Sequence, residues 1–271
     1  MLGQACVHGI TCGTNVVKAC MANWIYMSPH LDDVALSCGG LVWEQARQGH
    51  RVAVWTIFAG DPPPGELTDF ARELHARWHT GEQAASHRRE EDRVSCRRMG
   101  ATVRHFDLPD AIYRRSDRGS GPLYPTREAI FGPAHAEEEG LVERLSCLLG
   151  QAIAALESSP EDLILVGPLT SGGHVDHRLL RAALEGLNYP LWYYADFPYV
   201  LDYPETFEPG TVDGWASSTF EVTPAGLRTW MQAVEAHASQ IPTFWPDLMA
   251  MRRAIQDYCR WQGGIKLLRR G

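Results

Sequence analysis

The chain has 271 residues, of which 45% are hydrophobic and 21% charged, as in an ordinary globular protein that can bury a substantial core. Its 25 Lys and Arg stand against 33 Asp and Glu, a formal net charge of −8. Nucleic acid is therefore not an expected partner, because binding to phosphates needs a basic surplus. No window approaches the roughly 20 apolar residues of a spanning helix, so we expect no membrane span.

The N-terminal segment predicts no regular structure. We expect residues 1–22 to form a flexible leader and residues 23–271 to form a single α/β domain. Cys6, Cys12 and Cys20 match no C-x-x-C metal spacing, and the seven scattered cysteines do not resemble a disulfide framework. The segment also lacks the pattern of a signal peptide, so we expect a cytoplasmic protein with reduced thiols.

From residue 23 onward, apolar runs alternate with amphipathic segments. The expected strands are NWIYMS (23–28), RVAVWTIFAG (51–60), TVRHFDL (102–108), DLILVGPL (162–169), LWYYADFPYV (191–200) and SSTFEVT (217–223). The expected helices cover residues 39–50, 67–78, 86–100 and 137–156, the segment that follows residue 173, and most of 224–258. This alternation predicts a Rossmann-like fold with a mostly parallel sheet, helices on both faces and a helical C-terminal part.

Two stretches between these elements predict loops. Residues 61–65 (DPPPG) contain three consecutive prolines, which continue neither helix nor strand. Residues 109–140 are rich in Gly, Pro and charge and predict an elaborated surface loop. We expect both loops to frame the binding pocket, and the second to be mobile without substrate.

His and Asp cluster at two places, and each directly follows an expected strand. His30, Asp32 and Asp33 follow the first strand, and His174, Asp176 and His177 follow the fourth. In open α/β sheets, ligands bind outside the carboxyl ends of the strands. One such pair alone is explained by a helix cap and a surface histidine, but two clusters in equivalent positions indicate a site.

The spacing within the clusters suits a metal. His30 and Asp33 are three residues apart at a helix entry, so both side chains can point to one side while Asp32 points elsewhere. His174 and His177 have the same separation. Two histidines and one carboxylate form a catalytic zinc site that leaves a position for water.

These motifs also carry a family resemblance. The chain resembles the PIG-L/LmbE family of zinc-dependent N-deacetylases in two motifs: PHLDD followed by LSCGG, and GGHVDHR about 140 residues later. A weaker match is R-x-x-E at Arg88–Glu91 with the MGA that follows. The resemblance covers most of residues 24–187 and implies a Rossmann-like hydrolase that removes N-acetyl groups from glucosamine-containing substrates. The chain departs from the common family form at Pro29, Leu31 and Val34, where Ala, Pro and Glu are usual, which affects the expected substrate more than the chemistry.

The resemblance implies a role for each residue. His30, Asp33 and His177 would bind one Zn²⁺, and Asp32 would be the general base. His174 would stabilise the oxyanion, and Asp176 would orient His174. Arg88 would contact polar groups of the substrate, although a solvated charge explains it equally well.

The expected partner is a small-molecule glycoconjugate. FARELHARW, RREED and DAIYR resemble the actinobacterial branch of the family that acts in antibiotic biosynthesis, which favours a glycopeptide (teicoplanin-type) pseudoaglycone as substrate. A mycothiol-like or aminoglycoside precursor is the alternative. Aromatic walls suit sugars and apolar aglycones alike, and the candidates are Trp192, Tyr193, Tyr194, Phe197, Tyr199, Trp230, Phe244 and Trp245.

Three readings from other classes are open. His30-x-Asp32 with His177 fits the two-histidine-one-carboxylate triad of non-haem iron oxygenases, although those enzymes usually have all-β folds. A nucleotide-binding protein built on the Gly39-Gly40 pair lacks the G-x-G-x-x-G pattern. A non-catalytic saccharide-binding protein would keep an aromatic cleft and lose metal dependence.

Overall fold

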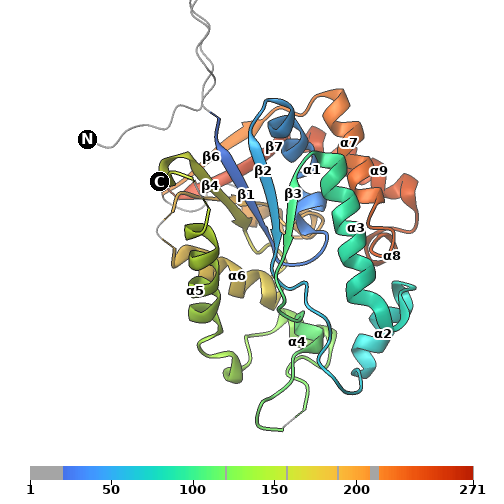
Figure 1. Ribbon diagram of the computed structural model, residues 1–271. Helices are drawn as coiled ribbons and strands as arrows, with labels where there is room; N and C mark the ends of the chain where they lie inside the picture. Colours follow the sequence, from blue (N-terminus) through green and yellow to red (C-terminus); the bar gives the residue numbers. More distant parts are fainter. Residues whose placement is uncertain (1–20, 120, 157, 188, 208–213, 271) are drawn as a thin grey trace, which may run out of the picture.

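The computed structural model describes residues 21–119, 121–156, 158–187, 189–207 and 214–270 (Figure 1). Most of the expected leader, with Cys6, Cys12 and Cys20, lies outside the described residues. The division into a leader and a single domain over 23–271 therefore stays a prediction. Among the described residues, no helix is both long and apolar enough to cross a membrane.

Within the described residues, seven strands form one sheet in the order β3-β2-β1-β4-β5-β7-β6. Strands β1 to β5 are parallel, and β7 pairs antiparallel with both β5 and β6. The bounds are β1 Asn23–Ser28, β2 Arg51–Thr56, β3 Thr102–His105, β4 Leu163–Pro168, β5 Leu191–Tyr194, β6 Trp215–Phe220 and β7 Ile265–Arg270.

Helices cover both faces of the sheet (Figure 1). On one face lie α1 Asp33–Arg47, α3 Ala84–Met99, α7 Pro224–Glu235 and α9 Leu248–Gln262, which pack against one another. On the other face lie α5 Leu141–Ala154 and α6 Val175–Glu185. Three shorter helices are α2 Asp69–Arg77, α4 Arg127–Phe131 and α8 Ile241–Phe244. The α/β fold with a mostly parallel sheet is thus confirmed.

The alternation of side chains along β1 explains why two helical layers are needed. Trp24 and Tyr26 contribute to one hydrophobic cluster, while Ile25 and Met27 contribute to a second cluster on the opposite face. All four side chains are buried. A strand with consecutive apolar residues, such as Trp24–Met27 here, is stable only when both faces of its sheet are covered.

Two expectations need correction. Residues 109–140 are more than a surface loop, because they contain α4 and place Ile112, Tyr124 and Ile130 in the second hydrophobic cluster. Strand β7 was not expected, because IKLLRR follows a helical stretch and its two arginines look like an exposed tail. It forms because it fills the position between β5 and β6 and buries Ile265, Leu267 and Leu268.

The glycine pair of α1 has a packing role. Gly39 and Gly40 lie inside the helix, and a Cβ atom on Gly39 would be 2.6 Å from Trp230 Cδ1. The Trp230 indole N–H donates to the carbonyl of Ala35 at 2.8 Å, which holds α7 close against α1. The pair does not open the helix, so the nucleotide-binding reading is wrong.

Candidate active site

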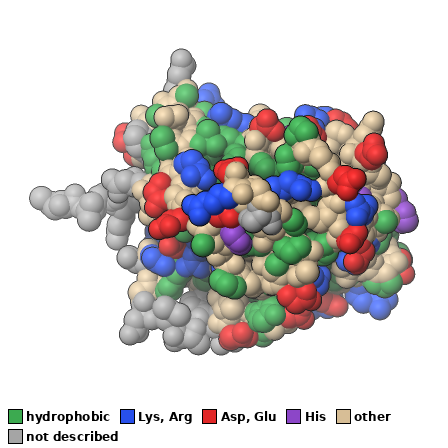
Figure 2. Space-filling model, turned by 90° about the horizontal axis from the view of Figure 1, so that it is seen from below, with side chains coloured by type: hydrophobic (Ala, Val, Ile, Leu, Met, Phe, Trp, Pro, Cys, Tyr) green, Lys and Arg blue, Asp and Glu red, His purple; other side chains and the backbone are tan. Residues whose placement is uncertain are grey.

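The two His/Asp clusters meet at the point where the strand order reverses. From β1 the chain proceeds through β2 and β3 on one side, and β4 and β5 extend the sheet on the other side. A crevice forms at such a switch point, outside the carboxyl ends of the strands. His30 follows β1 and His174 follows β4. Figure 2 shows this face, on which acidic, basic and hydrophobic side chains are interspersed.

A network of short hydrogen bonds fixes the turn after β1. The Ser28 hydroxyl donates to the carbonyl of His30 at 2.6 Å and accepts from the N–H of Val34 at 3.3 Å. The backbone N–H of His30 donates to Asp33 Oδ2 at 2.7 Å. Asp33 is the first residue of α1, where the helix dipole favours a negative charge. The turn therefore places the His30 and Asp33 side chains on one side, as their spacing predicts.

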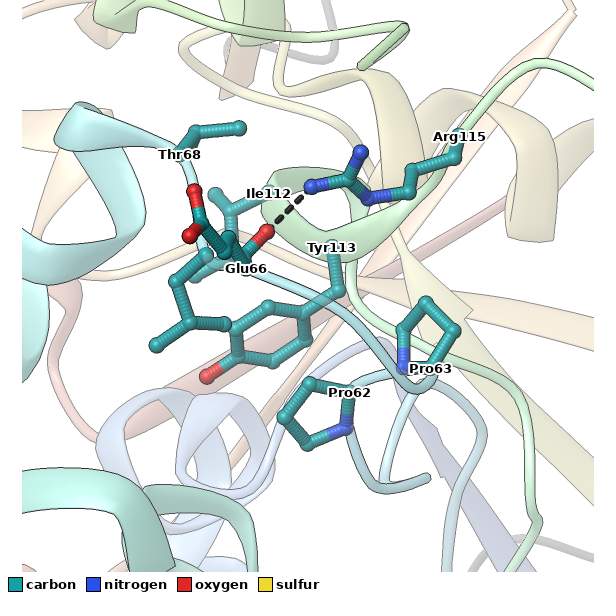
Figure 3. A pocket seen from close by; sticks show the side chains of 8 residues that line it. Pro62, Pro63, Glu66, Thr68, Ile112, Tyr113 and Arg115 are labelled. Atoms are coloured by element: carbon teal, nitrogen blue, oxygen red, sulfur yellow. Dashed lines mark hydrogen bonds between the residues drawn. The ribbon is translucent and has the colours of Figure 1, made fainter. Parts of the chain in front are cut away.

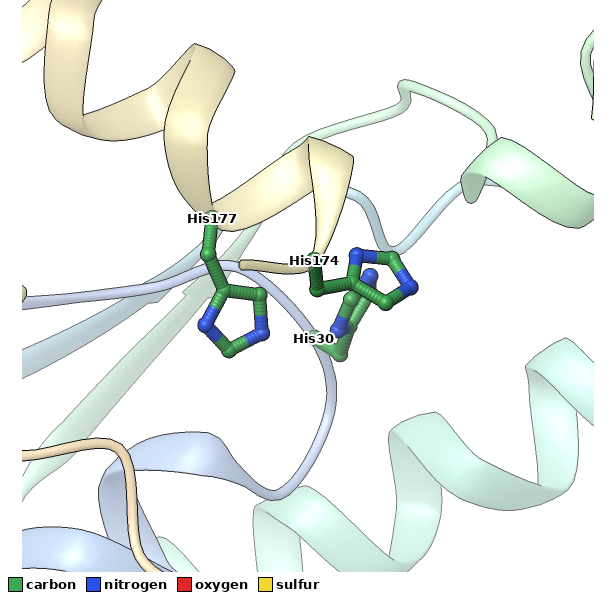
Figure 4. Close-up of side chains that lie close together, drawn as sticks. All are labelled: His30, His174 and His177. Atoms are coloured by element: carbon green, nitrogen blue, oxygen red, sulfur yellow. The ribbon is translucent and has the colours of Figure 1, made fainter. Parts of the chain in front are cut away.

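The second cluster approaches on a loop of unusual backbone geometry. After β4, Thr170, Gly172 and Gly173 all have positive φ angles, of 73°, 82° and 76°. His174 then caps α6, its Nδ1 accepting the backbone N–H of Asp176 at 3.2 Å. Figure 4 shows that the imidazoles of His30, His174 and His177 converge. The ring centroid of His30 lies 4.7 Å from that of His174 and 5.3 Å from that of His177.

One carboxylate oxygen of Asp33 links the two clusters. Asp33 Oδ2 lies 3.4 Å from His30 Nδ1 and 3.4 Å from His177 Nε2. Ligand atoms that surround a tetrahedral zinc ion at about 2.0–2.1 Å are about 3.3–3.4 Å apart. The two separations that involve Asp33 therefore have the spacing of a tetrahedral metal site.

In both histidines, the ring nitrogen that points away from Asp33 lies within hydrogen-bonding distance of another carboxylate. His177 Nδ1 lies 2.6 Å from Asp196 Oδ1, and His30 Nε2 lies 3.0 Å from Asp176 Oδ2. When these nitrogens carry the protons, His30 Nδ1 and His177 Nε2 present lone pairs beside Asp33. This carboxylate–histidine arrangement typically supports protein-bound zinc.

Two sets of three potential ligand atoms lie within 4.8 Å of one another in the described part of the chain, and neither set includes Asp33. One set combines His174 with His30 and His177, and the other combines His30 with Asp110 and Asp176. His174 Nδ1 is already engaged by the Asp176 N–H. In the second set, an Arg114 nitrogen lies 2.6 Å from Asp176 and an Arg88 nitrogen 3.9 Å from Asp110. These guanidinium groups disfavour a cation there, and the pairing of Asp33 with His30 and His177 rests on the two 3.4 Å separations of its carboxylate oxygen.

The adjacent carboxylates of Asp32 and Asp33 have opposite environments. Burial raises the pKa of Asp32, and the charge of Asp33 adds to this effect, while Arg88 opposes it. Burial also acts to raise the pKa of Asp33, but His177 and His30 outweigh it and hold that pKa well below its usual range. The Asp32 side chain makes no capping bond to α1 and lines the pocket. In many active sites, two carboxyl groups with different pKa values have different roles: the one with the raised pKa transfers protons, and the other stays ionised and stabilises positive charge.

Arg88 faces the pocket and is buried, so the solvated-charge reading of this residue is wrong. Its guanidinium carbon lies 4.7 Å from the centre of the Trp78 ring. One of its nitrogens lies 3.6 Å from Asp32 Oδ1. The arginine is thus positioned to contact a substrate and to balance the charge of Asp32.

The contacts of Asp176 differ from those expected. Its carboxylate contacts His30, the N–H of Ala111 at 3.0 Å and the guanidinium of Arg114, while only its backbone N–H contacts His174. Burial acts to raise the pKa of Asp176, but the charge of Arg114 and the His30 contact outweigh it and hold the pKa well below its usual range. The carboxylate therefore orients His30 more directly than His174.

A pocket with about 620 Å³ of atom-free space, part of it open to solvent, surrounds these residues. Five aromatic side chains line it: Phe70, Trp78, Phe131, Tyr199 and Phe244. Of the eight aromatic candidates from the sequence, Tyr199 and Phe244 line the pocket, and the other six are buried in the core. The pocket thus combines charged and aromatic side chains.

The two expected loops contribute unequally. Residues 109–140 supply Asp110, Ile112, Arg127, Ile130 and Phe131 to the pocket wall. Pro62 and Pro63 instead line a smaller neighbouring hollow, in which the Arg115 guanidinium donates to the carbonyl of Glu66 (Figure 3). The expectation that 61–65 frames the main pocket is therefore not met, although Ile112 lines both hollows.

Comparison with known proteins agrees with this geometry. The family described as PIG-L, GlcNAc-PI de-N-acetylase, matches residues 25–187, more than half of the chain. The chain belongs to the PIG-L family. A 2'-N-acetylparomamine deacetylase of Niallia circulans is 33% identical over 208 residues, which are 71% of each chain. A deacetylase of the same description from Streptomyces fradiae is 31% identical over 182 residues, 65% of this chain and 57% of the relative.

Solved structures extend the similarity beyond the region of the PIG-L match. The zinc-inhibited form of teicoplanin deacetylase Orf2 has a TM-score of 0.77 and 25% identity, covering 92% of this chain and 98% of that one. A deacetylase of the teicoplanin biosynthesis pathway has a TM-score of 0.76 and 26% identity with the same coverage.

Membership in the PIG-L family makes the protein a metal-dependent N-deacetylase. The saccharide-binding alternative without catalysis is therefore wrong. The iron-oxygenase reading is wrong as well, because the fold is α/β and the carboxylate oxygen beside both histidines belongs to Asp33, whereas that reading uses Asp32.

Proposed function

We propose that the protein removes the N-acetyl group from the N-acetylglucosaminyl unit of an aminoglycoside precursor of the 2'-N-acetylparomamine type. The sequence motifs favour a glycopeptide pseudoaglycone, but the curated relatives that are 33% and 31% identical act on 2'-N-acetylparomamine. That compound joins an amino sugar to a diaminocyclitol.

The observation that carries the mechanism is the Asp33 oxygen shared between His30 and His177. These three residues would hold the zinc ion, with Asp176 and Asp196 fixing the two imidazoles. A zinc ion held there would polarise the acetamide carbonyl and lower the pKa of a water molecule toward neutrality.

Asp32 and His174 would perform the proton transfer and charge stabilisation. Asp32, whose pKa is raised by burial, would accept the proton of the attacking water and later deliver it to the departing amine. Burial, reinforced by His30, keeps the pKa of His174 well below its usual value, so its imidazole is neutral. Because its Nδ1 accepts a backbone N–H, its proton lies on Nε2, from which it would donate to the developing oxyanion.

Arg88 would contact polar groups of the sugar and would limit the rise in the pKa of Asp32. The aromatic side chains Trp78, Tyr199 and Phe244 would pack against the faces of the sugar rings. The pocket is open to solvent on one side, so a large aglycone would extend out of it.

A glycopeptide pseudoaglycone is the second candidate substrate. It is supported by the solved teicoplanin deacetylases, which match 92% of this chain at TM-scores of 0.77 and 0.76. Their identities of 25% and 26% are lower than those of the paromamine deacetylases, so this candidate ranks second.

A panel assay would separate these candidates. Zinc-loaded protein would be incubated with 2'-N-acetylparomamine, an N-acetylglucosaminyl teicoplanin pseudoaglycone and free N-acetylglucosamine, and acetate release would be followed with mass spectrometry of the product. We expect the highest kcat/KM for 2'-N-acetylparomamine. A higher value for the pseudoaglycone would reverse our ranking, and no acetate from any N-acetylglucosaminyl compound would contradict the proposed chemistry.

A further inference from the structure

Part of the pocket wall comes from the C-terminal part of the chain. Gln240, Thr243 and Phe244 all line the pocket and lie in or next to α8. This segment lies outside residues 25–187, the region that matches the PIG-L family. None of the residues in our catalytic scheme comes from it.

A buried hydrogen-bond chain joins this segment to α3. Glu91 on α3 accepts the backbone N–H of Ser239 at 2.8 Å through Oε1 and the Ser239 hydroxyl at 2.5 Å through Oε2. The Gln240 amide nitrogen donates to the same hydroxyl oxygen at 2.9 Å. All three residues are buried, so the chain has no competition from bulk water.

The order of donors in this chain fixes the orientation of the Gln240 amide. A backbone N–H can only donate, so the Glu91 carboxylate is an acceptor, and it also takes the hydroxyl proton of Ser239. The Ser239 oxygen can then only accept, which requires the NH₂ end of Gln240. The opposite end, Oε1, shows no hydrogen bond within the described part of the chain, and Gln240 lines the pocket. The amide oxygen of Gln240 is therefore free to accept a hydrogen bond at the pocket wall.

Thr243, one helical turn away, has the complementary polarity. The Trp78 indole N–H donates to Thr243 Oγ1 at 3.2 Å, which leaves the hydroxyl proton of Thr243 free to donate. Phe244 adds an aromatic face and contacts Tyr199, with ring centroids 5.8 Å apart. The segment thus combines an oriented acceptor, a donor and an aromatic surface, a combination suited to a ring that carries amino and hydroxyl groups.

We propose that Gln240, held by Ser239 and Glu91, is a specificity-determining residue that accepts a hydrogen bond from an ammonium or hydroxyl group on the ring attached to N-acetylglucosamine. This inference rests on the proposed function for the choice of substrate, while the orientation of the amide is independent of it. Gln240 contributes binding to the attached ring and does not take part in bond cleavage.

The test compares Gln240→Met with the wild type on 2'-N-acetylparomamine and on free N-acetylglucosamine. A hydrogen bond to a charged group is worth enough to raise KM about tenfold to a hundredfold when it is lost. We expect that rise for 2'-N-acetylparomamine alone, with kcat unchanged and with free N-acetylglucosamine unaffected. The exposed Gln48, at the far end of α1, provides the control variant Gln48→Met.

A second readout does not depend on turnover. Paromamine binding to the zinc-free wild type, Gln240→Met and Ser239→Ala would be measured by calorimetry, and we expect both variants to bind more weakly. If the wild type does not deacetylate the substrate but Gln240→Met binds paromamine more weakly than the wild type does, the proposed function is refuted and the proposed binding role of Gln240 still holds. Equal changes in KM for both substrates, or a fall in kcat alone, would overturn the role of Gln240. Unchanged binding in Gln240→Met would overturn it as well.

Discussion

Replacing Arg114 by Met should destabilise the protein strongly, because it leaves two buried carboxylates without their counter-charge. The Arg114 guanidinium lies 2.6 Å from Asp176 Oδ1 and also binds Glu138, and all three side chains are buried. Removal of one partner from a buried ion pair typically costs about 3–5 kcal/mol. We expect a loss in this range, which is a large part of the roughly 5–15 kcal/mol that stabilises an ordinary domain.

Equilibrium unfolding of zinc-free protein in urea at pH 7 measures this loss. The control is Arg260→Met, which removes an ion pair with Asp257 in which both side chains are mostly exposed, and which should cost less than about 1 kcal/mol. A loss below about 1 kcal/mol for Arg114→Met would refute the reasoning.

The pH dependence is a further check. Because the folded-state pKa of Asp176 is depressed, its contribution to stability is present above the unfolded value of about 3.9 and is lost as the pH falls below it. The difference between Arg114→Met and wild type should therefore shrink below about pH 4.

Three further predictions address packing and the metal. Gly39→Ala places a Cβ atom 2.6 Å from Trp230, so the free energy of unfolding in urea should fall by about 1–3 kcal/mol despite the better helix propensity of Ala. In the control Gly150→Ala on α5, the nearest atom would be 3.4 Å from the new Cβ, so this change should be neutral or stabilising. Asp196→Asn removes the carboxylate that orients His177 and should weaken zinc affinity about 10–100-fold in a chelator competition, and unchanged affinity would show that Asp196 has no such role. Dialysis against a chelator should abolish acetate release and added zinc should restore it, whereas activity that persists in metal-free protein would contradict the proposed chemistry.

The sequence predicts the fold and the location of the site because both depend on local patterns. The apolar strands and the amphipathic helices are each visible within a short window, and the rule for parallel sheets brings His30 and His177 together from a distance. Spacing also predicts that Asp33 faces the histidines, since the helix entry controls its direction.

Other parts of the site depend on contacts between distant segments, which no local pattern reveals. Asp196 follows β5 as a single acidic residue among aromatic ones, and its contact with His177 appears only when β4 and β5 pair. Arg114 lies in a stretch that predicts a surface loop, yet its guanidinium forms a buried ion pair with Asp176. Ser239 and Gln240 follow a helix and reach the pocket through the packing of α7 on α1 and α3. Their only local signal is polarity within an otherwise apolar segment.

The measurement that tests the central claim most directly compares metal content and kcat in Asp32→Asn and Asp33→Asn. If Asp33 binds the metal and Asp32 is the general base, Asp33→Asn should lose both zinc and activity. Asp32→Asn should instead retain about one zinc ion per chain as the wild type does, while its kcat falls about 10²–10⁴-fold, the usual contribution of a positioned proton acceptor. Loss of zinc from Asp32→Asn with retention in Asp33→Asn would contradict the account, and near-normal kcat in Asp32→Asn would show that another group accepts the proton.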